Sequence, residues 1–133
     1  VTIASSGGGG GGRSSLGHCG TILKTSSSTE YFPLNEFLSQ TTESYAQHPI
    51  CAGTFKALRL RFILISGSAS VTVTLRVNGV STSLTLTANA TGTYVDEEDV
   101  AVNAGDLADL LVAVTITTGQ CRFGWSLDFI GSA

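Results

Sequence analysis

The fold follows from one stretch in the second half of the chain, Val71-Thr-Val-Thr-Leu-Arg-Val-Asn-Gly79. Its apolar residues alternate with Thr72, Thr74 and Arg76, and a period of two predicts a strand with one apolar and one polar face. Asn-Gly at its end is the strongest short-range hairpin signal, because both residues tolerate the positive φ of a type I′ turn. The next run, with Leu84-Thr-Leu86, supplies the returning strand.

Two more segments show the same alternation. Residues 58–65 carry an apolar side chain at every second position, at Leu58, Leu60, Phe62 and Leu64. Residues 122–130 do so with larger side chains, at Phe123, Trp125, Leu127 and Phe129, which we predict to form the central core strand. Ala104-Gly105-Asp106 predicts a turn before the apolar run 107–116. Short strands separated by turns predict an all-β chain, an antiparallel, jelly-roll-like β-sandwich.

The first 49 residues are less regular. Residues 1–17 contain six consecutive glycines, so we expect a glycine/serine-rich N-terminal arm at 1–17, followed by one β-sandwich domain at 18–133. Glycine loses much backbone entropy when it is ordered, and an ordered arm would therefore be held by neighbouring subunits. Residues 21–24 predict a short strand, and at most one helical turn fits before residue 49.

The composition excludes several classes of protein. The chain has 133 residues, enough for one domain, and only 13% of them are charged. Sixteen serines and 17 threonines oppose a helical bundle, and a net charge of −3 opposes nucleic-acid binding. No apolar run is long enough to span a membrane, and no signal peptide is visible.

Three cysteines, Cys19, Cys51 and Cys121, are an odd number. His18-Cys19 and His48-x-x-Cys51 are weak candidates for four zinc ligands, because an adjacent His-Cys pair is an awkward chelate. A disulfide within or between chains, and buried or unpaired thiols, are the open alternatives.

The acidic run 96–99 is a second weak metal candidate. Its carboxylates would suit calcium, but four consecutive acids between strands are typical of a solvated turn; they are Asp96, Glu97, Glu98 and Asp99. The chain has no Gly-x-Ser-x-Gly elbow and no base beside a nucleophile, and its glycine run lacks the ending of a phosphate loop. We therefore expect no catalytic residue, no cofactor, no required metal and no enzyme activity.

Aromatic residues could also form a sugar-stacking platform, from Trp125 together with Tyr31 and Phe32. Trp125 falls on the apolar face of its predicted strand, which favours core packing over ligand stacking.

Several of these segments together resemble a known group of domains. The segments are Ala52-Gly-Thr54, Leu58-Arg-Leu-Arg61, residues 71–80, Val100-Ala-Val-Asn-Ala-Gly-Asp106 and Trp125-Ser-Leu-Asp-Phe129. They are similar to β-sandwich domains of phage and phage-like virion proteins, and to the jelly-roll heads of the complement and tumour-necrosis-factor superfamily. The likeness covers about residues 52–130, without the Gly-x-y repeat of the collagen-tethered members.

The resemblance implies a homotrimeric surface module with no catalytic residues to transfer. We expect a structural virion protein, a head decoration, spike or fibre at the virion surface, that contacts other particle or capsid subunits through residues 1–17 and binds host surface glycans. The alternatives are a carbohydrate-binding or adhesion module and a subunit of a bacterial surface appendage, at an extracellular or cell-surface location. Glycan binding would mark the first alternative, and reductant-sensitive filaments the second.

Overall fold

The computed structural model describes residues 13–17, 20–34 and 39–132. Most of this part of the chain is β-strand, and its one helix, α1 (Glu43–Ala46), has four residues. Every strand pairing is antiparallel, which confirms the all-β prediction. The single short helix also agrees with the sequence, which allowed at most one helical turn.

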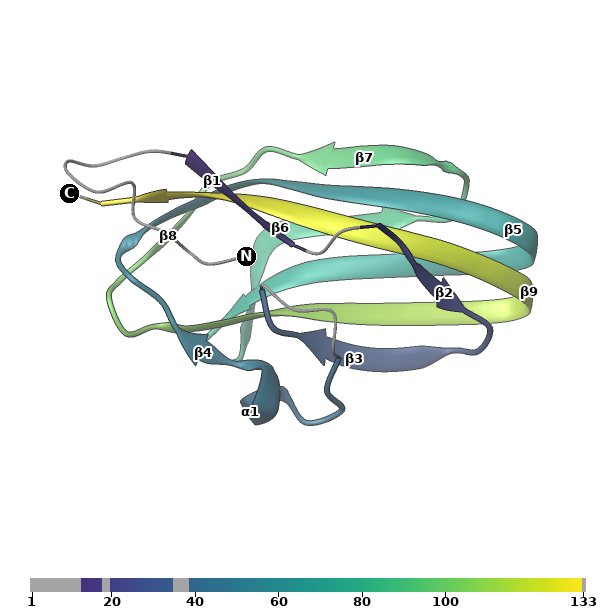
Figure 1. Ribbon diagram of the computed structural model, residues 1–133, viewed down its shortest axis with the longest axis horizontal. Coiled ribbons are helices and arrows are strands. Elements are labelled where there is room, and N and C mark those ends of the chain that lie inside the picture. The colour runs from purple at the N-terminus through teal and green to yellow at the C-terminus, as the bar shows by residue number, and fades with distance from the viewer. Residues whose placement is uncertain (1–12, 18–19, 35–38, 133) are drawn as a thin grey trace.

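Two strands of 25 residues each, β5 (Gly53–Val77) and β9 (Leu107–Gly131), form the centre of the molecule. They pair along their whole length, from Gly53 opposite Gly131 to Val77 opposite Ala108. In Figure 1 both ribbons run to the right-hand end, turn over together and return in the other layer. One continuous antiparallel sheet is thereby folded onto itself as a jelly-roll-like sandwich.

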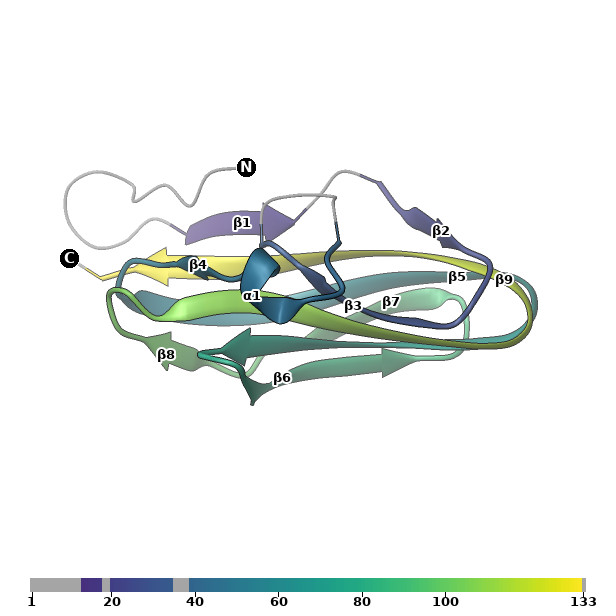
Figure 2. The ribbon, with the colours of Figure 1, turned by 90° about the horizontal axis from the view of Figure 1, so that it is seen from below.

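The shorter strands extend both layers on either side of this central pair (Figure 2). The first layer, here called sheet I, joins the first half of β5 and the second half of β9 with β1 (Arg13–Gly17), β2 (Ile22–Lys24), β7 (Gly92–Asp96) and β8 (Val100–Val102). The second layer, sheet II, joins the other two halves with β3 (Ser28–Phe32), β4 (His48–Pro49) and β6 (Val80–Ala88).

The fold-over depends on two glycines that face each other, Gly67 on β5 and Gly119 on β9. Both have positive φ, 75° and 80°, a conformation that glycine adopts at little cost. A side chain on either one would overlap a facing carbonyl group, that of Thr118 or Ser66. The sequence predicted separate strands on either side of these glycines, whereas the structure joins them into two bent strands.

The predicted Asn78-Gly79 hairpin is confirmed. It links β5 to β6 with both φ angles positive, 53° and 75°, as a type I′ turn requires. The Asn78 side chain also accepts a hydrogen bond from the Leu107 amide at 3.0 Å and donates one to Asp106 at 3.1 Å. The hairpin therefore fixes the start of β9, directly after the predicted turn at Gly105, where φ is 89°.

The core lies between the two sheets and contains the residues that the alternation predicted. Phe123, Trp125, Leu127 and Phe129 are at most 3% exposed, which confirms them as core residues. Phe55 packs against Phe129 with ring centroids 4.9 Å apart. Where sheet I meets sheet II at one side, Lys24 forms an ion pair of 2.5 Å with Glu30. Burial alone would raise the pKa of Glu30, but hydrogen bonds led by that from Lys24 outweigh it and lower this pKa.

The N-terminal boundary differs from the sequence-based division at residue 17. Arg13–Gly17 forms β1, which pairs with the end of β9, and Leu16 is 1% exposed in the core. The last five residues of the predicted arm are thus part of the sandwich. The glycine run of that arm lies outside the described residues.

Candidate functional site

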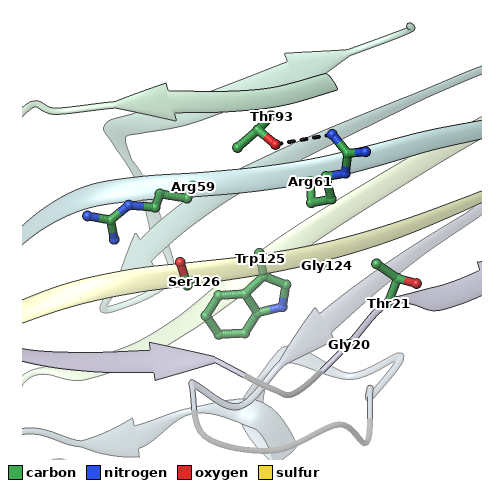
Figure 3. Close-up of a pocket in the computed structure, with 8 residues that line it drawn as sticks. All are labelled: Gly20, Thr21, Arg59, Arg61, Thr93, Gly124, Trp125 and Ser126. Atoms are coloured by element: carbon green, nitrogen blue, oxygen red, sulfur yellow. Dashed lines mark hydrogen bonds between the residues drawn. The ribbon is translucent and has the colours of Figure 1, made fainter. Parts of the chain in front are cut away.

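The candidate site is a hollow on the outer face of sheet I, which we call the Gly124 hollow. Its volume is about 340 Å³, and it is lined by Gly20, Thr21, Arg59, Arg61, Thr93, Gly124, Trp125 and Ser126. Figure 3 shows Arg59 and Arg61 rising from β5 beside Ser126 and Gly124 of β9, with Thr21 on one side and Thr93 on the other. Four segments distant in sequence therefore meet at this hollow.

The hollow exists because glycines replace side chains at its floor. Gly124 lies opposite Arg61 in the strand register, so no side chain fills the space beside this arginine. The segment before β2 crosses close to it: a Cβ atom on Gly124 would lie 2.6 Å from the Gly20 carbonyl oxygen. The backbone of residues 20 and 124 thus forms the floor, and side chains from β5, β7 and the segment before β2 surround it.

The two arginines have different partners. Arg59 forms a two-pronged ion pair with Asp128, at 2.8 and 3.1 Å, and this contact raises the pKa of the Arg59 guanidinium. Arg61 is exposed, and its Nη1 donates to the Thr93 hydroxyl at 3.2 Å. Among the described residues, no carboxylate lies within ion-pair distance of Arg61.

A third arginine supports one wall without lining the hollow. Arg122 donates from Nε to the Thr21 hydroxyl at 2.9 Å and from Nη2 to the Thr21 carbonyl at 3.0 Å. These two bonds fix Thr21 against sheet I and orient its hydroxyl.

The zinc candidates are only partly described. His18 and Cys19 lie outside the described residues, whereas His48 lies in β4 and Cys51 is an exposed free thiol. Cys121 is also free but buried in the core, and burial raises the pKa of its thiol. In the described ranges no three His, Cys, Asp or Glu residues are arranged to hold a metal ion.

The acidic run 96–99 begins with the last residue of β7 and leads to β8, and two of its carboxylates make local contacts. Asp96 accepts hydrogen bonds from the amides of Thr85, at 3.2 Å, and Glu98, at 3.1 Å. Asp99 forms an ion pair with Lys56 at 2.7 Å. These carboxylates hold the loop against strands β6 and β5.

The aromatic residues do not form a stacking platform at the hollow. Trp125 is 3% exposed and lies opposite the buried Leu60, so its ring belongs to the core although the residue lines the hollow. Phe32 is also buried and packs edge-on against Phe123, with ring centroids 6.2 Å apart. Core packing of Trp125 is therefore confirmed.

A second polar cluster lies beneath α1 on the outer face of sheet II, and sequence reasoning missed it. Arg76 binds Glu43 of α1 through Nε at 2.6 Å and Nη2 at 3.0 Å, and faces Asp109 across the sheet. Asp109 is fully buried, and among the described residues no hydrogen-bond donor reaches either of its carboxyl oxygens. Burial and the neighbouring Glu43 raise the pKa of Asp109 to about 8, against the opposing effect of Arg76.

Comparison of the sequence with protein-family models and with curated proteins gave no match. Among the described residues, α1 is far too short to cross a lipid bilayer, and no longer helix occurs there.

Proposed function

We propose that this protein is a structural component of the exterior of a phage or phage-like particle, as a head decoration, spike or fibre. The observation that supports a structural role is that charged side chains of this protein form ion pairs within the chain. Each described ion pair joins two different parts of the chain: Lys24–Glu30, Lys56–Asp99, Arg59–Asp128 and Arg76–Glu43. In these pairs the charged side chains fasten strands, loop and helix together.

The particle assignment is supported by the fold. A jelly-roll-like sandwich is what the resemblance to phage-like virion domains implies, and the two bent 25-residue strands run through both of its layers. We further propose that the module is a homotrimer that contacts other particle subunits through its N-terminal segment. Because β1 already belongs to the sandwich, this contact is assigned to residues 1–12.

The test is a search for the chain on intact particles. Particles banded by density are analysed by mass spectrometry, and unbroken particles are labelled with an antibody against the full chain. We expect a fixed number of copies per particle and labelling without disruption. Absence from the banded fraction, or labelling only after the particles are broken, would refute the exterior role. Native mass spectrometry of the purified chain tests the trimer, which a monomer at micromolar concentration would contradict.

A further inference from the structure

We propose that the Gly124 hollow binds one acidic sugar residue, and that Arg61 holds the sugar carboxylate. This inference goes beyond a structural role in a particle. It rests on three features of the hollow: a guanidinium without a carboxylate partner among the described residues, hydroxyl groups that can donate hydrogen bonds, and a volume that suits one sugar ring.

The described cations differ in whether they have a carboxylate partner. Four of them, at Lys24, Lys56, Arg59 and Arg76, form ion pairs within the chain. Arg61 lines the hollow, and its one described hydrogen bond joins it to the neutral hydroxyl of Thr93. A guanidinium has five N–H donors, so Arg61 has donors left to form a two-pronged pair with a carboxylate. The nearby carboxylate of Asp128 does not compete, because Arg59 holds it.

Most of the exposed lining is apolar, which suits the carbon face of a ring, and the hydroxyl groups within it can donate to acceptors of a ligand. The Thr93 hydroxyl accepts a hydrogen bond from Arg61, and the Thr21 hydroxyl accepts one from Arg122. Each of these hydroxyls therefore keeps its own proton for donation to a ligand. Ser126 adds a third hydroxyl to the lining. A sugar acid offers carboxylate, hydroxyl and ring oxygens as acceptors for these donors.

The size and floor of the hollow favour a sugar over a bare anion. A volume of about 340 Å³ lies at the lower end of small-molecule sites and exceeds what a sulfate or acetate ion would fill. The floor is the backbone of Gly20 and Gly124, against which the carbon face of a ring can lie. One guanidinium matches the single negative charge of one sugar carboxylate.

The test is a titration of the protein, followed by the amide NMR signals of Thr93, Gly124 and Ser126. The probes are glucuronic acid and N-acetylneuraminic acid, with glucose, galactose and acetate for comparison. We expect at least one sugar acid to bind with a Kd on the order of 1 mM, which corresponds to about −4 kcal/mol. The neutral sugars and acetate should bind at least tenfold more weakly. The two sugar acids, compared with each other, identify which kind of sugar the site prefers.

Two variants with the same change in net charge locate the site. Arg61→Gln should weaken sugar-acid binding at least tenfold without changing the melting temperature, because Arg61 is exposed and outside the ion pairs. Lys56→Gln, which removes a cation of the same strand outside the hollow, should leave binding unchanged.

The proposal is overturned if neither sugar acid shifts these amides at 20 mM, if acetate or a neutral sugar binds as tightly, or if both variants weaken binding equally. None of these outcomes affects the search for the chain on particles, so the two proposals fail separately.

Discussion

Replacement of the buried Asp109 by asparagine should remove a pH dependence of stability between pH 5 and 8. Asp109 lies beneath α1, fully buried opposite Arg76, with Glu43 as its acidic neighbour. Its pKa rises from the ordinary 3.8 to about 8 in the folded protein. Between these values the folded protein keeps a proton on Asp109 that the unfolded chain has released.

The sign and size of this pH dependence of stability follow from proton linkage. The stabilising effect of this proton is fully present below pH 3.8 and is lost as the pH rises to about 8. For one proton the free energy of unfolding falls by about 1.4 kcal/mol per pH unit, at most about 4 kcal/mol between pH 5 and 8. Glu30 and Glu43 have lowered pKa values, so their effects on stability fall below this window.

Urea unfolding at pH 5, 6, 7 and 8 measures this effect. The free energy of unfolding of the parent protein should decrease across the series relative to Asp109→Asn, whose amide cannot ionise. Asp106→Asn is the control, because hydrogen bonds lower the pKa of Asp106 and keep its titration below the window. Parallel curves for the parent and Asp109→Asn would refute the buried, protonated carboxyl.

Three further predictions concern the core, the fold-over and the N-terminal segment. Trp125→Ala should lower the free energy of unfolding by about 3–5 kcal/mol, and an unchanged melting temperature would remove this ring from the core. Gly67→Ala should lower the melting temperature more than Gly105→Ala, because both have positive φ but only Gly67 faces a carbonyl group; equal effects would contradict the fold-over. Deletion of residues 2–12 should preserve the melting temperature and abolish particle incorporation, whereas deletion of residues 2–17 should also lower the melting temperature, as it removes β1.

The strands were predictable because their signals are local. Alternation from Val71 to Val77 and the Asn78-Gly79 pair are complete within nine residues, and the structure contains both as predicted. The joining of two predicted strands into β5 could not be predicted from local signals. It requires Gly67 to pair with Gly119, 52 positions later in the chain, and no local sequence pattern predicts this pairing.

The N-terminal strands were harder to predict because they lie at the edges of the sheets. Of β2, β3 and β4, the sequence predicted only the first. β3 alternates polar and apolar residues weakly, since Glu30 faces the ion pair with Lys24 instead of the core. β3 is a strand because it pairs with β9, and this pairing exists only in the folded chain.

The candidate site depends on a shift of one residue in the pairing of β5 with β9. In the sequence, this shift is visible only as one irregular spacing of apolar residues. Phe55 is in the core, and strict alternation from it would place Arg59 and Arg61 in the core as well. An extra residue at Ala57, with φ of 50°, shifts the register between Lys56 and Arg59 and turns both arginines outward.

The signal for this bulge was the spacing of three between Phe55 and Leu58, where an unbroken strand would show two. The bulge alone does not make the hollow. The shifted register also places Arg59 near Asp128 and Arg61 opposite Gly124, so one arginine is paired while the other borders an open floor. These pairings join residues more than 60 positions apart, and for that reason neither arginine could be distinguished from the sequence. The ligand-binding capacity proposed for sheet I is thus a consequence of one bulge in β5 acting through its pairing with β9.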